Sequence, residues 1–235
     1  MNILVIGAGG VGASMASIAE TRSFFAKFVL ADISFARAEE AVALLDDRSK
    51  FVAEQVDARD KEAIKSLISR VQADVVVNAC DPRLNEPIFD AAFESHCNYI
   101  DMAMNLSEPH ASNPYEEVGS PLGKDQLAAD EAWRERGLLA LVGMGVEPGL
   151  SDVFARYAAD NLFDTIDEIG VRDGSNLSID GLDFAPTFSI WTTIEECLNP
   201  PIVWEKNRGL YTTDCFLNQK YSTFPQASDR MSAST

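Results

Sequence analysis

The stretch Ile3-Leu4-Val5-Ile6-Gly7-Ala8-Gly9-Gly10-Val11-Gly12 decides the fold class. Its first four residues form a short, continuous apolar run, which is typical of a strand buried on both faces. The glycines that follow fit the pattern G-x-G-x-x-G, and a helix rich in small residues is predicted over residues 11–21. Between a buried strand and a helix, such glycines indicate a loop that binds the pyrophosphate of a dinucleotide.

Each glycine of this loop has an expected role. Gly7 permits the tight turn, Gly9 lets backbone N–H groups approach the phosphates, and Gly12 lets the helix pack closely on the strand. Gly10 and Val11 complete the predicted cofactor-binding loop at the positive end of the helix.

Asp32 lies twenty residues after Gly12, at the end of the predicted strand 28–31. A carboxylate at this place hydrogen-bonds the adenosine ribose hydroxyls and repels a 2′-phosphate. We therefore expect NAD or NADP as cofactor, with NAD favoured by Asp32. Arg37 is the nearby cation that would accommodate a phosphate, but its helical position predicts a solvated side chain.

The strand–helix unit repeats along the chain. Further strands are predicted at residues 51–56, 75–77, 99–101 and 138–142, and helices at residues 34–45, from 60 onward, 87–93 and 124–136. This alternation predicts an α/β fold, a Rossmann-type doubly wound parallel sheet with helices on both faces. Residues 102–123 are rich in Pro, Asn, Ser and Glu and predict an exposed loop beside the site.

The alternation of predicted strands and helices ends near residue 162, and we divide the chain into three parts. Residues 1–161 are the predicted dinucleotide-binding Rossmann domain. Residues 162–216, with an expected strand at 165–171, are part of a second, smaller α/β domain. Residues 217–235 form an atypical polar tail with no core pattern.

Composition excludes several classes of protein. The chain has 235 residues, 46% of them hydrophobic, and a formal net charge of -18, which disfavours nucleic acid and anionic membrane surfaces as partners. Its cysteines, Cys80, Cys97, Cys197 and Cys215, show no CxxC spacing, so we expect no metal site and a reducing, cytoplasmic location.

Several further motifs occur in a fixed order. They are Asn78-Ala79-Cys80-Asp81-Pro82, Asn98-Tyr99-Ile100-Asp101, the run from Gly145 to Asp152 (GVEPGLSD) and the run from Phe188 to Glu196 (FSIWTTIEE). With the glycine loop, they resemble the saccharopine dehydrogenase-like family, which includes saccharopine reductases and carboxynorspermidine dehydrogenases. The resemblance extends from Met1 to about Phe216.

This resemblance implies an NAD(P)-dependent oxidoreductase that transfers hydride to or from the C–N bond of an amino-acid- or polyamine-derived secondary amine. Lysine-pathway and polyamine-forming members share this reaction, so the resemblance does not choose between their substrates. Members of the family usually continue well beyond this length, so the substrate domain is expected to be incomplete, as in a chain truncated at its C-terminus.

Asp101 and Asp152 are the predicted catalytic residues, since each follows a predicted strand at the edge where ligands bind. Each has a purely structural alternative. Asp101 would cap the loop after its strand, and Asp152 would be an exposed carboxylate in the first turn of the following helix. The family resemblance implies that Asn78 and Pro82 contact the cofactor. The predicted substrate-binding residues are Glu147, Trp191, Thr192 and Thr193.

Two other interpretations compete with this one. Short-chain dehydrogenases share the glycine loop but need a Tyr-x-x-x-Lys pair, which none of the five tyrosines forms. The second alternative is a non-catalytic dinucleotide-binding module whose incomplete second domain forms no substrate pocket. The expected partner is a small amino-acid or polyamine substrate, and a homodimer is left open.

Overall fold

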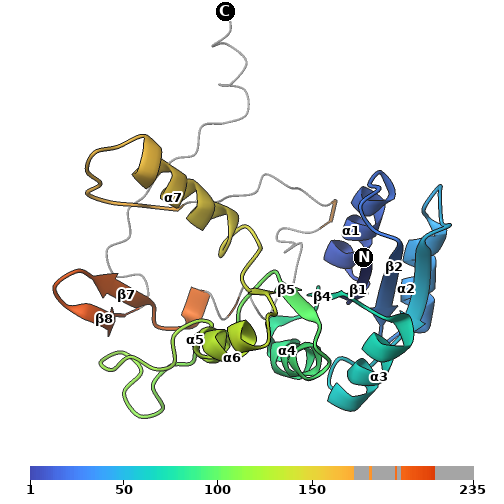
Figure 1. Ribbon diagram of the computed structural model, residues 1–235. Helices are drawn as coiled ribbons and strands as arrows, with labels where there is room; N and C mark the ends of the chain where they lie inside the picture. The colour runs from blue at the N-terminus through green and yellow to red at the C-terminus, as the bar shows by residue number, and fades with distance from the viewer. Residues whose placement is uncertain (172–179, 182–193, 195–196, 215–235) are drawn as a thin grey trace, which may run out of the picture. The chain divides into compact units, whose positions relative to one another are not determined.

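The computed structural model describes residues 1–171, 180, 181, 194 and 197–214 (Figure 1). The chain divides into two compact units. One consists of Met1–Glu108 and Ser120–Ile166, and the other of Pro109–Gly119 and Asp167–Thr235. The glycine loop and every strand of the large sheet belong to the first unit.

A six-stranded parallel sheet forms the centre of the first unit. In spatial order its strands are β3 (Phe51–Gln55), β2 (Lys27–Asp32), β1 (Asn2–Ile6), β4 (Val75–Asn78), β5 (Asn98–Asp101) and β6 (Ala140–Leu141). The chain begins in the middle, moves out to β3, and then crosses back to place β4 on the other side of β1. This order confirms the predicted Rossmann-type sheet and creates a switch point between β1 and β4, beyond whose ends ligands bind.

The register of the strands aligns the residues of the predicted site. Ile6, the last residue of β1, pairs with Ala31 of β2 and with Asn78 of β4, while Asn78 also pairs with Asp101 of β5. The carboxyl ends of these parallel strands therefore meet at one edge. The glycine loop, Asp32, Asn78 and Asp101 all lie at that edge.

Helices connect the strands. They are α1 (Gly10–Glu20), α2 (Phe35–Ala43), α3 (Lys61–Val71), the 3-10 helix η1 (Pro82–Leu84), α4 (Asn85–Glu94), α5 (Lys124–Ala128), α6 (Asp130–Glu135) and α7 (Leu150–Asn161). The Ser34 hydroxyl accepts the N–H of Arg37 at the start of α2, and the Asp60 carboxylate accepts the N–H of Ala63 at the start of α3. These caps fix both helix starts where the sequence predicts them.

Three element predictions differ from the structure. The predicted helix 124–136 is divided into α5 and α6, because Ala129 between them has ψ of -2°, away from the helical value of about -42°. The predicted strand 138–142 is reduced to β6, whose two residues pair with β5. The predicted strand 165–171 is wrong: these residues form no strand, since no described strand pairs with them.

Alternate residues of the central strands face two separate cores. Leu4 and Ile6 of β1 pack with α3, α4 and Trp133, whereas Ile3 and Val5 pack on the opposite face with α1 and α2. Both faces of the sheet are therefore covered, as the continuous apolar run of β1 predicts. The covered sheet leaves its carboxyl edge as the place for ligands.

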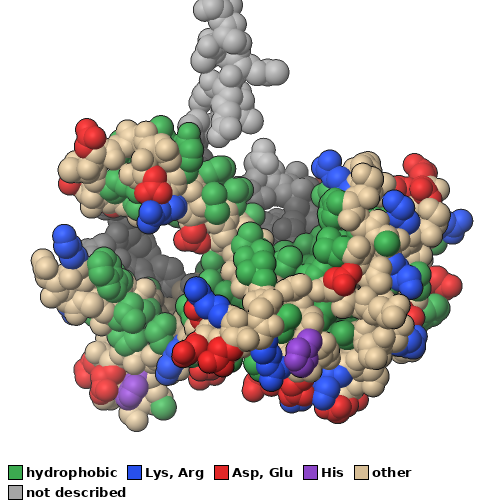
Figure 2. All heavy atoms as spheres, in the orientation of Figure 1, with side chains coloured by type: hydrophobic (Ala, Val, Ile, Leu, Met, Phe, Trp, Pro, Cys, Tyr) green, Lys and Arg blue, Asp and Glu red, His purple; other side chains and the backbone are tan. Residues whose placement is uncertain are grey.

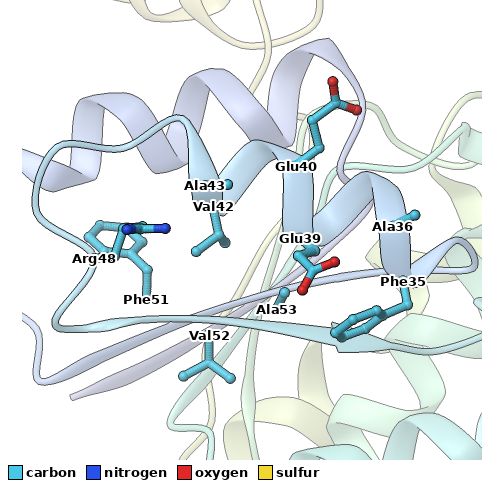
Figure 3. Close-up of a pocket in the computed structure, with 10 residues that line it drawn as sticks. All are labelled: Phe35, Ala36, Glu39, Glu40, Val42, Ala43, Arg48, Phe51, Val52 and Ala53. Carbon is cyan, nitrogen blue, oxygen red and sulfur yellow. The ribbon is translucent and has the colours of Figure 1, made fainter.

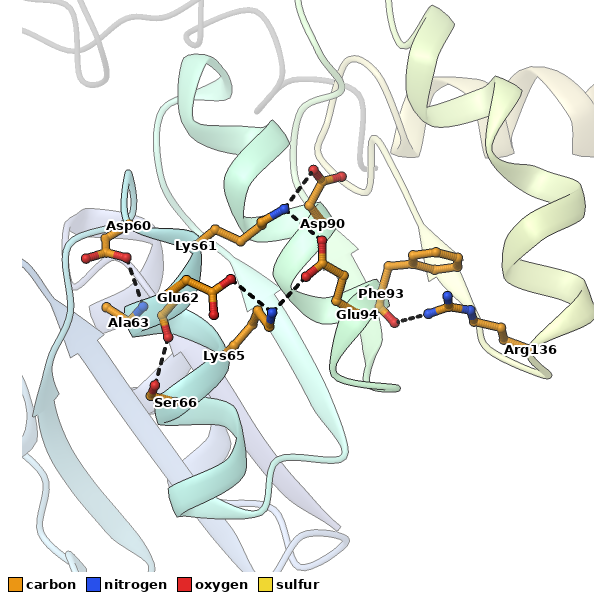
Figure 4. Close-up of polar contacts among 10 residues, drawn as sticks. All are labelled: Asp60, Lys61, Glu62, Ala63, Lys65, Ser66, Asp90, Phe93, Glu94 and Arg136. Carbon is orange, nitrogen blue, oxygen red and sulfur yellow. Dashed lines mark hydrogen bonds and ion pairs between the residues drawn. The ribbon is translucent and has the colours of Figure 1, made fainter.

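Charged side chains cover the side of the first unit that carries α3 and α4 (Figure 2). Lys61 and Lys65 of α3 both bond Glu94 of α4, at 2.7 and 2.8 Å, and Lys61 lies 3.9 Å from Asp90 (Figure 4). The guanidinium of Arg136 donates to the carbonyl of Phe93 at 2.8 Å. The ion pairs join α3 to α4 on the surface, and the hydrogen bond from Arg136 joins the end of α6 to α4.

The second unit contains an antiparallel hairpin. It is formed by β7 (Ile202–Glu205) and β8 (Gly209–Thr212), with Ile202 paired to Thr212. Among the described residues of the whole chain, no helix is long and apolar enough to cross a membrane.

Candidate dinucleotide-binding site

The glycine loop has the geometry that its sequence predicts. Gly7 has φ of +107°, and a Cβ there would lie 2.7 Å from the carbonyl oxygen of Ala79. At Gly12 a Cβ would lie 1.9 Å from the carbonyl oxygen of Gly7, so α1 could not pack as closely. Around Gly9 and Gly10, in contrast, no atom apart from those of the adjacent residues and the helix's own backbone lies within 4 Å of the Cβ position. Two glycines are thus required by packing, and two face open space at the start of α1.

Asp32 connects the end of β2 to the glycine loop. One carboxylate oxygen accepts the N–H of Ala8 at 2.9 Å, and the other accepts the N–H of Ser34 at 2.9 Å. The residue is only 7% exposed. Its carboxylate is therefore held in a fixed orientation beside the loop.

A cavity of about 450 Å³ lies beyond the ends of β1 to β4. Residues lining it include Gly7, Gly9, Asp32, Arg37, Arg59 and Asp81. The Arg37 guanidinium is 3.8 Å from the Asp32 carboxylate, although its side chain is 61% exposed. The cavity thus combines the open side of the glycine loop with the carboxylate of Asp32, which the sequence predicts to bind the ribose, and a nearby cation.

Two similar Asp-x-Arg turns follow β3 and β4. The Arg59 guanidinium donates to both carboxylate oxygens of Asp57 at 2.9 and 2.7 Å, and Arg83 donates likewise to Asp81 at 2.8 Å on each oxygen. The hydrogen bonds from Arg59 lower the pKa of Asp57 to about 2. Each turn thus presents a paired carboxylate and guanidinium at the strand ends.

A second cavity, of about 640 Å³, lies at the outer edge of the sheet between α2 and β3. Figure 3 shows Val42, Phe51 and Arg48 facing one another there, while Val52 points to the other side of the strand. It contains none of the predicted site residues. Although larger, it has no phosphate-binding loop, so we assign the dinucleotide site to the cavity at the strand ends.

A buried polar network lies at the ends of β4 and β5. The Asn78 amide donates to Asn85 Oδ1 at 2.7 Å and to the Tyr99 hydroxyl at 3.1 Å, and its oxygen accepts the N–H of Cys80 at 3.0 Å. Asp101 accepts from Gln126 Nε2 at 2.7 Å. Burial raises the pKa of Asp101.

Residues 3–141 match the family described as the saccharopine dehydrogenase NADP-binding domain. The chain belongs to this family. It is 32% identical to carboxynorspermidine synthase of Vibrio cholerae over 213 residues, covering 87% of this chain and 50% of that protein. It is 28% identical to carboxyaminopropylagmatine dehydrogenase of a Synechocystis strain, covering 83% of this chain and 46% of that protein.

Among solved structures, saccharopine dehydrogenase (L-Glu forming) of Saccharomyces cerevisiae is similar in fold. The TM-score is 0.51 at 15% sequence identity, and the match covers 68% of this chain and 31% of that one. This saccharopine dehydrogenase family chain therefore spans about half the length of the curated relatives it matches.

The remaining predicted residues of this family member lie in different settings. Asn78 is 2% exposed and Asp101 is 1% exposed, so both are buried, and neither lines the strand-end cavity. Pro82 begins η1, next to the cavity-lining Asp81. Asp152 accepts the N–H of Gly149 at 2.8 Å and caps α7, while Glu147 is exposed. Trp191, Thr192 and Thr193 lie outside the described residues.

The sequence did not reveal Asn85, Gln126 or Arg59 as members of this region. Gln126 bonds a residue 25 positions earlier, and no local pattern marks such a contact. Arg59 had a weak signal, since Asp-x-Arg occurs twice shortly after a predicted strand, at residues 57–59 and 81–83. The roles of the predicted catalytic and substrate residues stay predictions.

Proposed function

We propose that this chain is an NAD(P)-dependent oxidoreductase that transfers hydride to or from the C–N bond of an amino-acid- or polyamine-derived secondary amine. The observation that carries the proposal is the family match over residues 3–141 together with the open geometry of the glycine loop. The names of the carboxynorspermidine and carboxyaminopropylagmatine relatives favour a polyamine-related substrate.

The residues of the strand-end cavity fit a dinucleotide. The N–H groups of Gly9, Gly10 and Val11 lie at the start of α1, where the helix dipole favours phosphate, and the open space over Gly9 admits it. Asp32, aligned by two backbone N–H groups, has further lone pairs for ribose hydroxyls. When bound, the nicotinamide supplies a hydride donor or acceptor.

Cofactor preference depends on two opposed charges at the same point. The buried carboxylate of Asp32 favours NAD, since it accepts from the ribose hydroxyls and repels a 2′-phosphate. Arg37, 3.8 Å away and exposed, is the cation that would pair with that phosphate in NADP. We propose that NAD is preferred and that Arg37 determines how well NADP is tolerated.

The remaining predicted residues are proposed to bind the substrate and to transfer its proton. In the direction of reduction, a bound reduced nicotinamide would supply the hydride for an imine carbon, and a side chain of the site would deliver the proton that the nitrogen needs to become a secondary amine. We propose Asp152 and Asp101 for proton handling or its support, and Glu147 with Trp191, Thr192 and Thr193 for substrate binding. The proposed domains are residues 1–161 for the cofactor and 162–216 for the substrate.

The second candidate function is dinucleotide binding without turnover. In this alternative the cofactor-binding part of the chain binds NADH or NADPH, and the part that follows it forms no substrate pocket. We propose a cytoplasmic location in either case because the cysteines of the described residues, Cys80, Cys97 and Cys197, are free. A homodimer is the proposed assembly, to be tested by light scattering.

Thermal unfolding with and without ligands separates these candidates. NADH and NADPH should raise the melting temperature under both proposals, because a ligand that binds the native state stabilises it. A further rise with saccharopine or carboxynorspermidine supports the oxidoreductase. The absence of any shift with either dinucleotide would contradict both.

A further inference from the structure

Asp101 connects β5 to the turn that follows β6. Its Oδ1 accepts the N–H of Gly143 at 2.6 Å, and its carbonyl oxygen accepts the N–H of Met144 at 2.8 Å. The residue is 1% exposed. Both the side chain and the backbone of this residue therefore hold the start of the segment that leads to Glu147 and Asp152.

The second carboxylate oxygen connects Asp101 to the loop after β5. It accepts from Gln126 Nε2 at 2.7 Å, and Gln126 is itself 5% exposed. The Oε1 of Gln126 in turn accepts the N–H of Asn105 at 2.8 Å. One buried amide thus links the strand end, α5 and the loop around residue 105.

A third connection runs to the end of β4. Asp101 is paired with Asn78 across β4 and β5, and the Asn78 amide donates to the hydroxyl of Tyr99. Asn78 in turn orients the N–H of Cys80 in the loop beside the strand-end cavity. The Asp101 carboxylate thus bonds the turn after β6 and α5 directly, and Asp101 is linked through Gln126 and Asn78 to two further segments at the carboxyl edge of the sheet.

In a sheet with this strand order, the adenosine half of a dinucleotide lies over β1 to β3, and the nicotinamide half lies over β4 and β5. Asp32 and the glycine loop are the proposed contacts of the adenosine half. The segments held by Asp101 border the second half, but the carboxylate itself is too buried to contact a ligand.

From this arrangement we infer that Asp101 is a positioning residue for the nicotinamide half of the cofactor. The inference rests on the proposed function, and it assigns Asp101 a role different from direct proton transfer. The carboxylate orders the segments that contact the nicotinamide ribose and ring, while the adenosine half binds independently of it.

The test compares the affinities of NADH and of ADP-ribose, which lacks the nicotinamide, by isothermal titration of the full chain. In Asp101→Asn, the new amide N–H faces the donors that the carboxylate accepted, so at least one link breaks. We expect NADH binding to weaken about tenfold and ADP-ribose binding to stay within about twofold. Gln126→Met should show the same selective loss while keeping Asp101.

The double variant Asp101→Asn with Gln126→Glu exchanges the amide and the carboxylate. The amide then at position 101 can accept from the N–H of Gly143 and donate to the carboxylate at position 126, whose other oxygen can accept the N–H of Asn105. We expect NADH affinity to return to within about threefold of the wild type. Asp74→Asn is the matched control, because that exposed carboxylate accepts the N–H of Asn2 at the opposite edge of the sheet.

The titrations can contradict the positioning role of Asp101 in three ways. Equal weakening of NADH and ADP-ribose, unchanged NADH binding in Asp101→Asn, or a folded double variant with no recovery would each overturn the positioning role. If Asp101→Asn does not fold, Gln126→Met alone decides by the same comparison. Failure of the wild type to bind either ligand would instead overturn the proposed function.

Discussion

The carboxylate of Asp32 accepts a hydrogen bond from the backbone N–H of Ala8 at 2.9 Å, which joins the end of β2 to the glycine loop. The residue proposed to select the ribose thus also holds the loop proposed to bind the phosphates. Because both proposed functions use one buried carboxylate, we expect cofactor choice and loop geometry to be coupled in this domain.

Replacement of Asp32 by Asn tests this coupling. One of the N–H groups of Ala8 and Ser34 would then face an amide N–H, so we expect a loss of about 1 to 3 kcal/mol in the free energy of unfolding. The preference for NADH over NADPH should also fall, because the charge that repels the 2′-phosphate is gone. Urea unfolding and titrations with both dinucleotides measure the two effects; an unchanged preference would mean that Asp32 does not face the ribose.

Loss of Arg37 should change the preference for NADH over NADPH in the direction opposite to loss of Asp32. We expect the wild type to bind NADH at least about tenfold more tightly than NADPH, the equivalent of one charge-assisted hydrogen bond. Arg37→Ala should widen this ratio by weakening NADPH binding alone. Arg70→Ala, which removes an exposed arginine paired with Glu54 away from the strand-end cavity, is the control. Tighter NADPH than NADH binding by the wild type would refute the assignment of preference to Asp32.

The ion pairs between α3 and α4 predict a pH dependence of stability (Figure 4). Hydrogen bonds from Lys61 and Lys65 lower the pKa of Glu94 from 4.5 to about 2. A depressed folded-state pKa contributes stability above the unfolded value, and this is lost as the pH falls from about 4.5 to about 2.

Glu94→Gln should therefore melt at a lower temperature than the wild type at pH 7, with a difference that shrinks below pH 4.5. The difference will be small because the pair is exposed. Glu131→Gln, at an exposed carboxylate in the first turn of α6, is a suitable control for charge alone. A difference in melting temperature between the wild type and Glu94→Gln that stays constant down to pH 2 would argue against the lowered pKa of Glu94.

Low turnover is a further expectation for the 235-residue chain. It spans about half of its curated relatives, and Val153, Phe154 and Tyr157 of α7 expose 57%, 65% and 58% of their surface. Steady-state assays with saccharopine and carboxynorspermidine, in both directions and with both cofactors, measure this. Robust turnover would show that the present chain forms a complete substrate pocket.

The cofactor half of the fold could be predicted because its signals are local. The glycine pattern, the apolar strand 3–6 and the cap at Ser34 each depend on neighbours in the chain, and all three agree with the structure. The network around Asp101 could not be predicted in this way, because Gln126 and Gly143 reach it from 25 and 42 residues away. The strand predicted at 165–171 had suitable residues but no partner strand among the described residues.

Dinucleotide binding by the glycine loop is the central claim, and Gly9→Val is its most direct test. No atom apart from those of Gly9 and its two chain neighbours lies within 4 Å of the Cβ position of Gly9, so the variant should fold as the wild type does, while its side chain fills the space that the phosphates need. Ser17→Val, exposed later in α1, is the matched control. In isothermal titrations with NADH we expect binding by the wild type and by Ser17→Val, and none by folded Gly9→Val. Equal NADH affinity in all three proteins would contradict the assignment of the site to this loop.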